Sequence, residues 1–496
     1  MIAFFHRLVN TENGLRIAAQ SEVVRVPALL LFLPMFFITQ GSILCTTDTG
    51  AYLQTISNIE TQGLAAAIPM DRSVFYGLFL WAGKHYFGIG PLLSQMGIAI
   101  HPPFLFEILL VPCVLLLLGA VYLLESAFTQ RAAWIAAIAM SVATLLTPLP
   151  WFVFQVMPDV FTPLLFLYAM MFLKATSRGA KVLSTFVLLF ATLMHHSHLP
   201  LLTAFAAGIH LLKKPLRNQL DLTAKNTLRL LAISLIPWII TIALNAWAGN
   251  GITPSKGSHV FLMGKLCENG ILKAYLDENP IATNPLAKSH PEIATFYQHK
   301  DDLPKHAWDF VWNDQPLLGP TGGWHHSKDL YLSIYAATLT SPKLVIKHIE
   351  AAVKATFQQV FLNHAGDGLE PLSKEGAVAT ELKKHFPGDY QGFFGHSAQQ
   401  QSRINFGTFN QVYDIVAAIL ILTCLLLLYK FSNPQYAWLL GVALFFVLCN
   451  AFVTANLANV LSRLNARTFW LIPLMCAAVI TAILLELRDG NRQSTR

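Results

Sequence analysis

Two carboxylates are placed where they could act on a substrate at a membrane surface. Asp48, in the segment TTDTGAYL, follows the first long apolar run, and Asp159 follows Pro158 in WFVFQVMPDVFTPLL. A carboxylate at such a surface can act as a general base, deprotonating an acceptor hydroxyl while a sugar is displaced from a phosphate leaving group. Both positions also have a simpler interpretation, because Asp48 and the Pro158-Asp159 pair are ordinary helix starts.

Two arginines, Arg463 and Arg467 in SRLNARTFWLIPL, are candidates for binding a phosphate. Four residues apart on a helix, their guanidiniums would share one face, which suits a phosphate or pyrophosphate. Because Arg467 adjoins the last apolar run, we expect it to contact the phosphate more closely than Arg463. The alternative is that both anchor the chain at the membrane interface beside Trp470.

Histidines form two further groups, His195, His196 and His198 in LMHHSHLPLL and His325-His326 in GPTGGWHHSKD. Three imidazoles on a loop could hold zinc, but no Cys, Asp or Glu lies nearby in sequence to complete the ligand set. The pattern favours the polar lining of a cavity between broken helices. No metal or nucleotide cofactor is expected, since the sequence has no HExxH, Walker or GxGxxG motif.

Composition places these residues in a membrane protein. Of 496 residues, 54% are hydrophobic and only 12% charged, against about a quarter charged in soluble domains. Apolar runs recur that are long enough to cross a hydrocarbon core of about 30 Å, which excludes a single soluble globule. The formal net charge is +7, but Lys and Arg lie in short loops between apolar runs, so they indicate membrane topology and not nucleic-acid binding.

We predict an all-helical polytopic protein with about ten transmembrane helices. The predicted spans are Val26 to Leu44, Pro103 to Leu124, Ala132 to Leu149, Met157 to Lys174, Val182 to His196, Leu199 to Leu212, Leu230 to Ala248, Val412 to Lys430, Gln435 to Ala455 and Thr468 to Leu487. The pair within 182–212 is short for two crossings, so re-entrant or broken helices are an alternative. The segment 74–89 is expected to lie along the interface, because Arg72, Lys84 and His85 disfavour a crossing.

The distribution of basic residues assigns sides to these spans. It predicts that both termini are cytoplasmic. The parts are a cytoplasmic segment 1–25, a membrane domain 26–248 with a first outer loop 45–102, a mainly helical extracytoplasmic domain 249–411, membrane helices 412–487 and a cytoplasmic tail 488–496. Cys45 and Cys267 are the only two of the six cysteines outside apolar stretches, so a disulfide framework is not expected.

Taken together, these segments resemble the GT-C membrane glycosyltransferases. The resemblance is carried by Asp48 with Tyr52, the RSVFYGLF segment that follows Asp71, Pro158-Asp159 and SRLNARTFWLIPL. It implies a polyprenyl-phosphate-linked sugar as donor and a lipid, glycan or protein as acceptor, with membrane lipids around the chain and no nucleic acid as partner. In this family's pattern Asp48 would act near the acceptor, Asp159 would be a second carboxylate, and Arg463 or Arg467 would contact the donor phosphate.

The remaining polar candidates would line the substrate cavity; they are Tyr52, Arg72, Tyr76, His195, His196, His198, His325 and His326. The sequence departs from the family pattern where DTG replaces a pair of adjacent acids, and where HHSHLP occupies the place of a lysine in the middle helices. The segment 249–411 resembles that of uncharacterised bacterial members, which implies that the protein lies in a bacterial inner membrane. Acceptor binding is one interpretation of this segment. Two other functions stay open, a transporter of lipid-linked sugars and a non-catalytic protein of envelope assembly.

Overall fold

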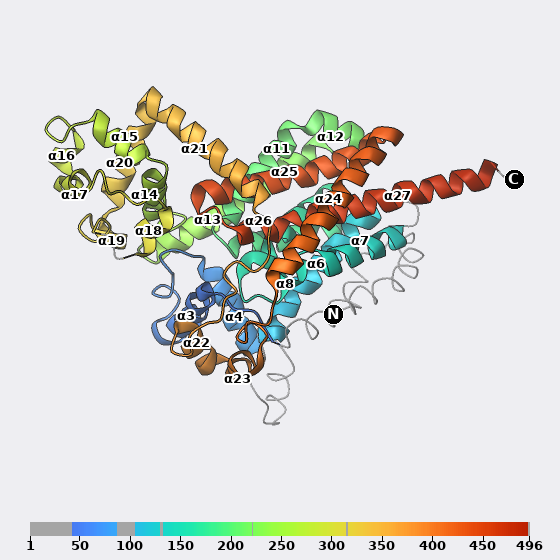
Figure 1. The fold of residues 1–496 in the computed structure, drawn as a ribbon, viewed down its shortest axis with the longest axis horizontal. Coiled ribbons are helices and arrows are strands. Elements are labelled where there is room, and N and C mark those ends of the chain that lie inside the picture. Colours follow the sequence, from blue (N-terminus) through green and yellow to red (C-terminus); the bar gives the residue numbers. More distant parts are fainter. Residues whose placement is uncertain (1–41, 87–104, 129–131, 221, 314–315, 495–496) are drawn as a thin grey trace.

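The computed structural model describes residues 42–86, 105–128, 132–220, 222–313 and 316–494, and the regular structure in these ranges is helical (Figure 1). Their only β-type pairing is an isolated parallel bridge between Leu44 and Gln155. The predicted all-helical class is confirmed for this part of the chain. The predicted cytoplasmic segment 1–25 and most of the first predicted span lie outside the described residues.

Five helical stretches in the described ranges are long and apolar enough to cross a membrane. They are α6 (Leu105–Ala127), α13 (Ala224–Trp247), α24 (Phe406–Phe431), α25 (Pro434–Leu457) and the stretch Ser462–Arg488, shared by α26 (Ser462–Phe469) and α27 (Leu471–Ser494). Along α24 the exposed side chains Ile415, Ile419, Leu422 and Leu426 recur at helical spacing. An apolar face of this kind is expected against lipid and not against water, so the protein is a membrane protein.

Four shorter helices coincide with other predicted spans. They are α7 (Ala132–Leu146), α9 (Thr162–Lys174), α10 (Arg178–Leu193) and α11 (His198–Leu211). Each has fewer than the roughly 20 residues of a straight crossing. Nearly every residue of α9 is buried, and α9 packs against α6 and α10, so it lies at the centre of the bundle.

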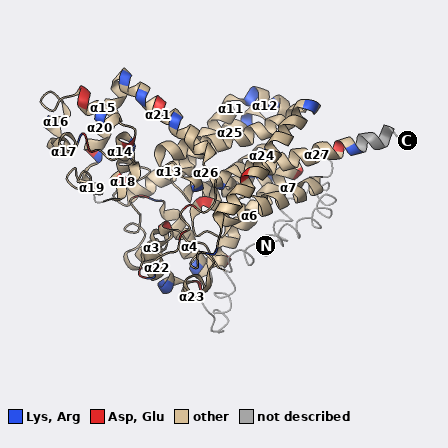
Figure 2. Ribbon diagram, viewed as in Figure 1, with Lys and Arg blue, Asp and Glu red and all other residues tan. Residues whose placement is uncertain are grey.

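Small helices connect the bundle and begin the region outside it. They are α8 (Leu149–Val153), η1 (Pro158–Phe161), α12 (Lys213–Leu220), α3 (Thr47–Gln62) and α4 (Val74–Tyr86). The segment expected along the interface is helical in α4, which packs against α3 and α6 through Tyr76, Phe79 and Leu80. Lys and Arg lie in α12 and at the end of α24, whereas the long helices carry few charges between their ends (Figure 2).

The segment 249–411, predicted as one domain, divides between two hydrophobic cores. One core is built by α14 (Ser258–Glu268), α15 (Ile271–Glu278), α16 (Leu286–Ser289), η2 (Pro291–Ile293), α17 (Ala294–Gln298), α18 (Ala307–Trp312), α19 (Gly323–His326) and α20 (Lys328–Thr340). We call this unit the insert. The helices α22 (Ala377–His385) and α23 (Pro387–His396) instead join the main core beside α3 and α4. The long helix α21 (Pro342–Phe361) leads from the insert to α25 (Figure 1).

Candidate functional site

Backbone pairing brings the two candidate carboxylates together. The amide of Leu44 donates to the carbonyl oxygen of Phe154 at 2.9 Å, and the amide of Val156 donates to the carbonyl oxygen of Leu44 at 2.9 Å. These bonds hold the chain just before α3 beside the chain just before η1. Asp48 in the first turn of α3 and Asp159 in η1 therefore lie on neighbouring segments.

The helix start at Asp48 does not use its carboxylate as the cap. The N-cap residue of α3 is Thr46, and its amide donates to Oγ1 of Thr49 at 3.0 Å. Thr49 Oγ1 in turn donates to the carbonyl oxygen of Val156 at 3.1 Å. The capping interpretation of Asp48 is thus wrong, and its carboxylate is available for other contacts.

The carboxylate of Asp48 contacts two guanidiniums. Arg463 Nη2 donates to its Oδ2 at 2.7 Å, and Arg72 Nη2 lies 3.5 Å from its Oδ1. Arg72 also donates to both the backbone oxygen of Asp48, at 3.1 Å, and the carboxylate of Asp71, at 2.6 and 2.9 Å. The Asp48 side chain is 23% exposed and that of Arg463 16%, so a ligand can reach this pair.

A second ion pair, between Asp159 and Arg467, is almost completely buried. Arg467 Nη1 donates to Asp159 Oδ1 at 2.6 Å, with side-chain exposures of 0% and 3%. Arg467 Nη2 donates to Asn450 Oδ1 at 3.1 Å and to Ser197 Oγ at 3.3 Å. Asp159 Oδ2 and the Nε of both Arg463 and Arg467 are buried with no hydrogen-bond partner among the described residues. Buried charges are ordinarily paired and fully hydrogen-bonded.

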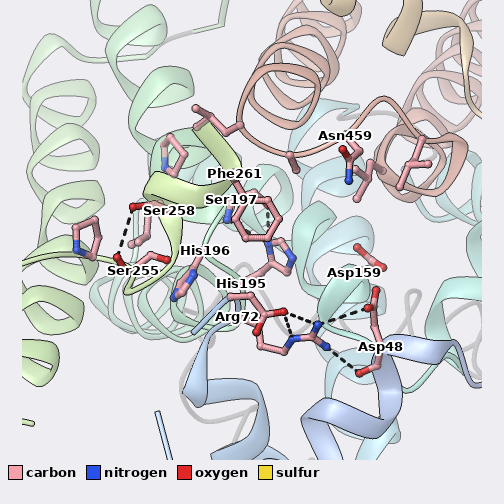
Figure 3. Close-up of a pocket in the computed structure, with 18 of the residues that line it drawn as sticks. Asp48, Arg72, Asp159, His195, His196, Ser197, Ser255, Ser258, Phe261 and Asn459 are labelled. Atoms are coloured by element: carbon pink, nitrogen blue, oxygen red, sulfur yellow. Dashed lines mark hydrogen bonds and ion pairs between the residues drawn. The ribbon is translucent and has the colours of Figure 1, made fainter. Parts of the chain in front are cut away.

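A cavity of about 300 Å³ opens onto these charges (Figure 3). Its charged end is formed by Asp48, Asp71, Arg72, Asp159 and Arg463, with His195 and His196 beside them. The rest of the wall is mostly apolar and comes from α11, α13, α25 and the insert; it includes Leu199, Trp238, Phe261, Trp308, Trp312 and Leu457. A cavity with one charged end and an apolar wall suits an amphipathic ligand.

The two arginines differ in depth, in the opposite order to our expectation. Both lie on α26, but only Arg463 lines the cavity, while Arg467 is fully buried behind it. One helical turn separates them along the axis, and this turn carries Arg467 into the core against Asp159. The expectation that Arg467 is the better placed for a ligand phosphate is wrong.

Tyr52 and Arg72, both predicted to line the substrate cavity, meet at its wall. The Arg72 guanidinium lies 5.2 Å from the centre of the Tyr52 ring, a cation–π contact. Burial is the main cause that raises the pKa of Tyr52, so its hydroxyl stays neutral. Tyr76 does not line the cavity; it is buried and packs edge-on against Tyr52 with ring centres 4.9 Å apart.

The histidines divide into three placements. His195 and His196 line the cavity in the turn between α10 and α11. His198 points away from it, with Nε2 2.8 Å from Thr162 Oγ1 and Nδ1 2.7 Å from the carbonyl oxygen of Ala191. His325 and His326 lie on α19 of the insert and do not line the cavity. In the described ranges no three His, Cys, Asp or Glu side chains are grouped to hold a metal.

Sequence reasoning missed several residues of the site. Asp71 adjoins Arg72 in the sequence DRSVF, and this adjacency was the available signal. Trp308 and Trp312, four residues apart in WDFVW, line the cavity from α18, and an exposed aromatic pair at helical spacing could have indicated a binding face. Trp238 and Asn450 lie within apolar spans, where nothing in the local pattern distinguishes them.

Comparisons with protein-family models, with curated proteins and with solved structures were made for the whole chain. None of the three gave a match.

Proposed function

We propose that this protein is a membrane glycosyltransferase of GT-C type, which moves a sugar from a polyprenyl-phosphate carrier to an acceptor hydroxyl. The observation that carries the proposal is the meeting of Asp48 and Arg463 at the charged end of a cavity with an apolar wall. A carboxylate base, a phosphate-binding cation and a surface for a lipid chain are the parts that such a transfer requires.

The donor phosphate would bind at Arg463 and Arg72. Both now hold the carboxylate of Asp48, and the buried Nε of Arg463 has no partner among the described residues. The phosphodiester of the donor has two charged non-bridging oxygens, which can take over these donors bidentately. Its arrival would release Asp48 from the arginines while the carrier's chain lies along the wall at Leu199, Trp238 and Leu457.

The released Asp48 would then serve as the general base. It accepts the proton of the acceptor hydroxyl as the hydroxyl oxygen forms its bond to the anomeric carbon. The bond from that carbon to the phosphate oxygen breaks, and the electron pair leaves with the phosphate, whose charge Arg463 and Arg72 stabilise. We assign Asp159 no contact with the substrate, because Arg467 holds its Oδ1 and its side chain is only 3% exposed; it would fix the position of α26 and so of Arg463.

The proposal extends to topology. We place the cavity at the extracytoplasmic face of a bacterial inner membrane, with about ten crossings and both termini in the cytoplasm. Support comes from the basic residues of α12 and the end of α24, which follow the pattern of cytoplasmic loops. The shorter helices α7, α9, α10 and α11 would complete the crossings as tilted or broken helices within the bundle.

The test is the substitution Asp48→Asn in a strain that lacks the chromosomal gene. The matched control is Asp302→Asn, which removes an exposed carboxylate of the insert. Mass spectrometry of envelope glycans and lipids should show a product that depends on the gene, restored by the control. Loss of a general base should lower turnover by about 100- to 10,000-fold, while the purified variant still binds the donor.

Three outcomes would contradict the proposal. Product at the control level with Asp48→Asn would remove Asp48 as the base. If the strain that lacks the gene carries unchanged sugars on every acceptor, and a lipid-linked sugar accumulates on one side of its membrane, the protein would be a transporter. A deletion that alters no glycan or lipid would leave an assembly role.

A further inference from the structure

A second hollow, of about 490 Å³, adjoins the candidate site. It lies between α14, the start of α18, α21 and the connection from α25 to α26. Its lining includes Trp308, Asn459 and Leu461, which also line the first cavity. The two hollows therefore share a wall, and a molecule in the second lies next to the cavity that contains Asp48.

The second hollow presents positive charge. Lys305, His306 and Lys354 line it, and within the described ranges neither lysine has an ion pair. Glu268, the acid of the lining, is already neutralised, because its Oε2 accepts from Lys265 Nζ at 3.1 Å and from the amide of Ala307 at 3.0 Å. Two lysines without a counter-charge in a hollow of this size suit an anionic group of a small molecule.

The helix α21, which forms one wall of this hollow, is amphipathic, and its apolar side is exposed. Its exposed apolar side chains, each 56 to 65% exposed, are Ile346, Ile349, Val353, Phe357 and Phe361. They recur at helical spacing as one stripe. A different side of α21 faces the hollow through Ala351, Lys354, Ala355 and Gln358.

A third side of α21 is fastened to the membrane bundle. Asn456 Nδ2 of α25 donates to Thr356 Oγ1 at 3.2 Å. The side chain of Gln359 exchanges two hydrogen bonds with the backbone of Leu461, at 2.8 and 3.0 Å. The helix α25 also exposes Leu448 and Phe452, which lie at helical spacing from Asn456. The helix that carries the stripe thus packs against a candidate membrane span that has exposed apolar side chains of its own.

We propose that an anionic lipid is the second ligand of this protein, with its phosphate-bearing headgroup on Lys305 and Lys354 and its acyl chains along Val353 and Phe357. An apolar stripe in water would be unfavourable by about 25 cal/mol for each Å² exposed, and in lipid that term vanishes. Lysines that flank such a stripe extend to anionic headgroups at the interface. This inference rests on the proposed function, in which the lipid would be the acceptor of the sugar. It favours a lipid over a glycan or a protein as that acceptor.

Binding can be measured without turnover. Purified protein is titrated in detergent with phosphatidylglycerol and, in parallel, with zwitterionic phosphatidylcholine, with native mass spectrometry as the readout. The test variant is Lys305→Gln with Lys354→Gln; the control, Lys288→Gln with Lys374→Gln, removes equal charge at exposed sites elsewhere. At about 1 kcal/mol for each lysine, the test variant should bind phosphatidylglycerol about 30-fold more weakly.

The same titration separates the possible sources of the anion. Inorganic phosphate and glycerol phosphate should fail to displace the lipid at comparable concentrations, because they lack the chains that contact the stripe. Equal binding of phosphatidylglycerol by the test variant and the control would overturn the proposal. So would displacement by free phosphate alone, which would indicate a site for a soluble anion.

The stripe is tested separately with a spin label at Val353→Cys in bilayers of phosphatidylcholine with a minor fraction of phosphatidylglycerol. The native cysteines are buried thiols, so the engineered residue is the one open to labelling, and Asp302→Cys serves as the water-exposed control. The Val353 label should be accessible to oxygen and shielded from a water-soluble nickel complex. A label as open to nickel as the control would place the stripe in water or against a protein, and overturn the proposal. Neither lipid binding nor label accessibility depends on turnover. Failure of the lipid proposal can therefore be distinguished from failure of the Asp48→Asn test.

Discussion

The buried pair of Asp159 and Arg467 should be the most stability-critical charge contact of the site. The substitution Asp159→Asn removes the only carboxylate that bonds the guanidinium of Arg467 in the described part of the chain, and this guanidinium is 0% exposed. Asn450 and Ser197 would remain as its neutral acceptors. Arg467 cannot lose its proton to escape this situation, because arginine stays charged in proteins.

The size of the effect follows from burial. Breaking a buried ion pair by removing one partner costs about 3 to 5 kcal/mol, whereas a solvent-exposed pair contributes about 1 kcal/mol or less. Asp48, 23% exposed and shared between two arginines, lies nearer the second case. Asp159→Asn should thus destabilise the fold several times more than Asp48→Asn.

Thermal unfolding of the purified variants at one scan rate measures which of them is less stable, with Asp48→Asn as the matched control. The double variant Asp159→Asn with Arg467→Met removes both charges and should unfold at a higher temperature than Asp159→Asn alone. Equal transition temperatures for Asp159→Asn and Asp48→Asn, or strictly additive losses in the double variant, would refute the reasoning from burial.

Three further outcomes are expected from groups at and around the site. Arg463→Lys should weaken donor binding by about 10- to 100-fold, since one bidentate contact is lost, while Arg467→Lys lowers the unfolding temperature more than the donor affinity; donor titration and thermal unfolding measure the two. Burial raises the pKa of Asp389 to about 7, so its stabilisation is full below about pH 4 and is lost as the pH rises through 7; Asp389→Asn should flatten that part of the profile of unfolding temperature against pH. Burial, with Lys84 nearby, lowers the pKa of His385, so its stabilisation is present above its ordinary pKa of about 6.5 and is lost as the pH falls; His385→Gln should remove this acid-side loss.

Run length and helical spacing predicted much of the fold. The spans that became α6, α13, α24 and α25 are recognisable because a long apolar run is itself the physical condition for crossing a membrane. The segment 249–411 was likewise predicted to be mainly helical; apolar residues recur at helical spacing in SHVFLMGKL and SPKLVIKHIEAA, which lie in α14 and α21. The same spacing does not say which core a helix joins, and so α22 and α23 could not be separated from the insert.

The candidate site was predictable by residue type and not by contact. Arg463 and Arg467 stood out because they lie on the predicted outer side of a span, where Lys and Arg are fewer than on the cytoplasmic side. Asp48 and Asp159 stood out because each is an acid close to a predicted span. Their pairing depends on chain segments hundreds of residues apart, which no local pattern encodes. Spacing on α26 gave a common face for both arginines, but depth in the bundle is set by neighbours such as Asn450.

The contacts across the site also set the order in which the protein can be completed during synthesis. Asp48 and Arg463 are 415 residues apart, and Asp159 and Arg467 are 308 apart. At a ribosomal rate of about 5 to 20 residues per second, roughly 20 to 80 s pass between the two ends of the first contact. The 308 residues between Asp159 and Arg467 take roughly 15 to 60 s at the same rate. During that shorter interval Asp159 has no guanidinium from α26 to pair with, so its carboxylate stays unpaired or takes up a proton. A polypeptide released before α26 would keep that unpaired acid, which makes an unfinished chain the less stable species and the preferred one for membrane proteases.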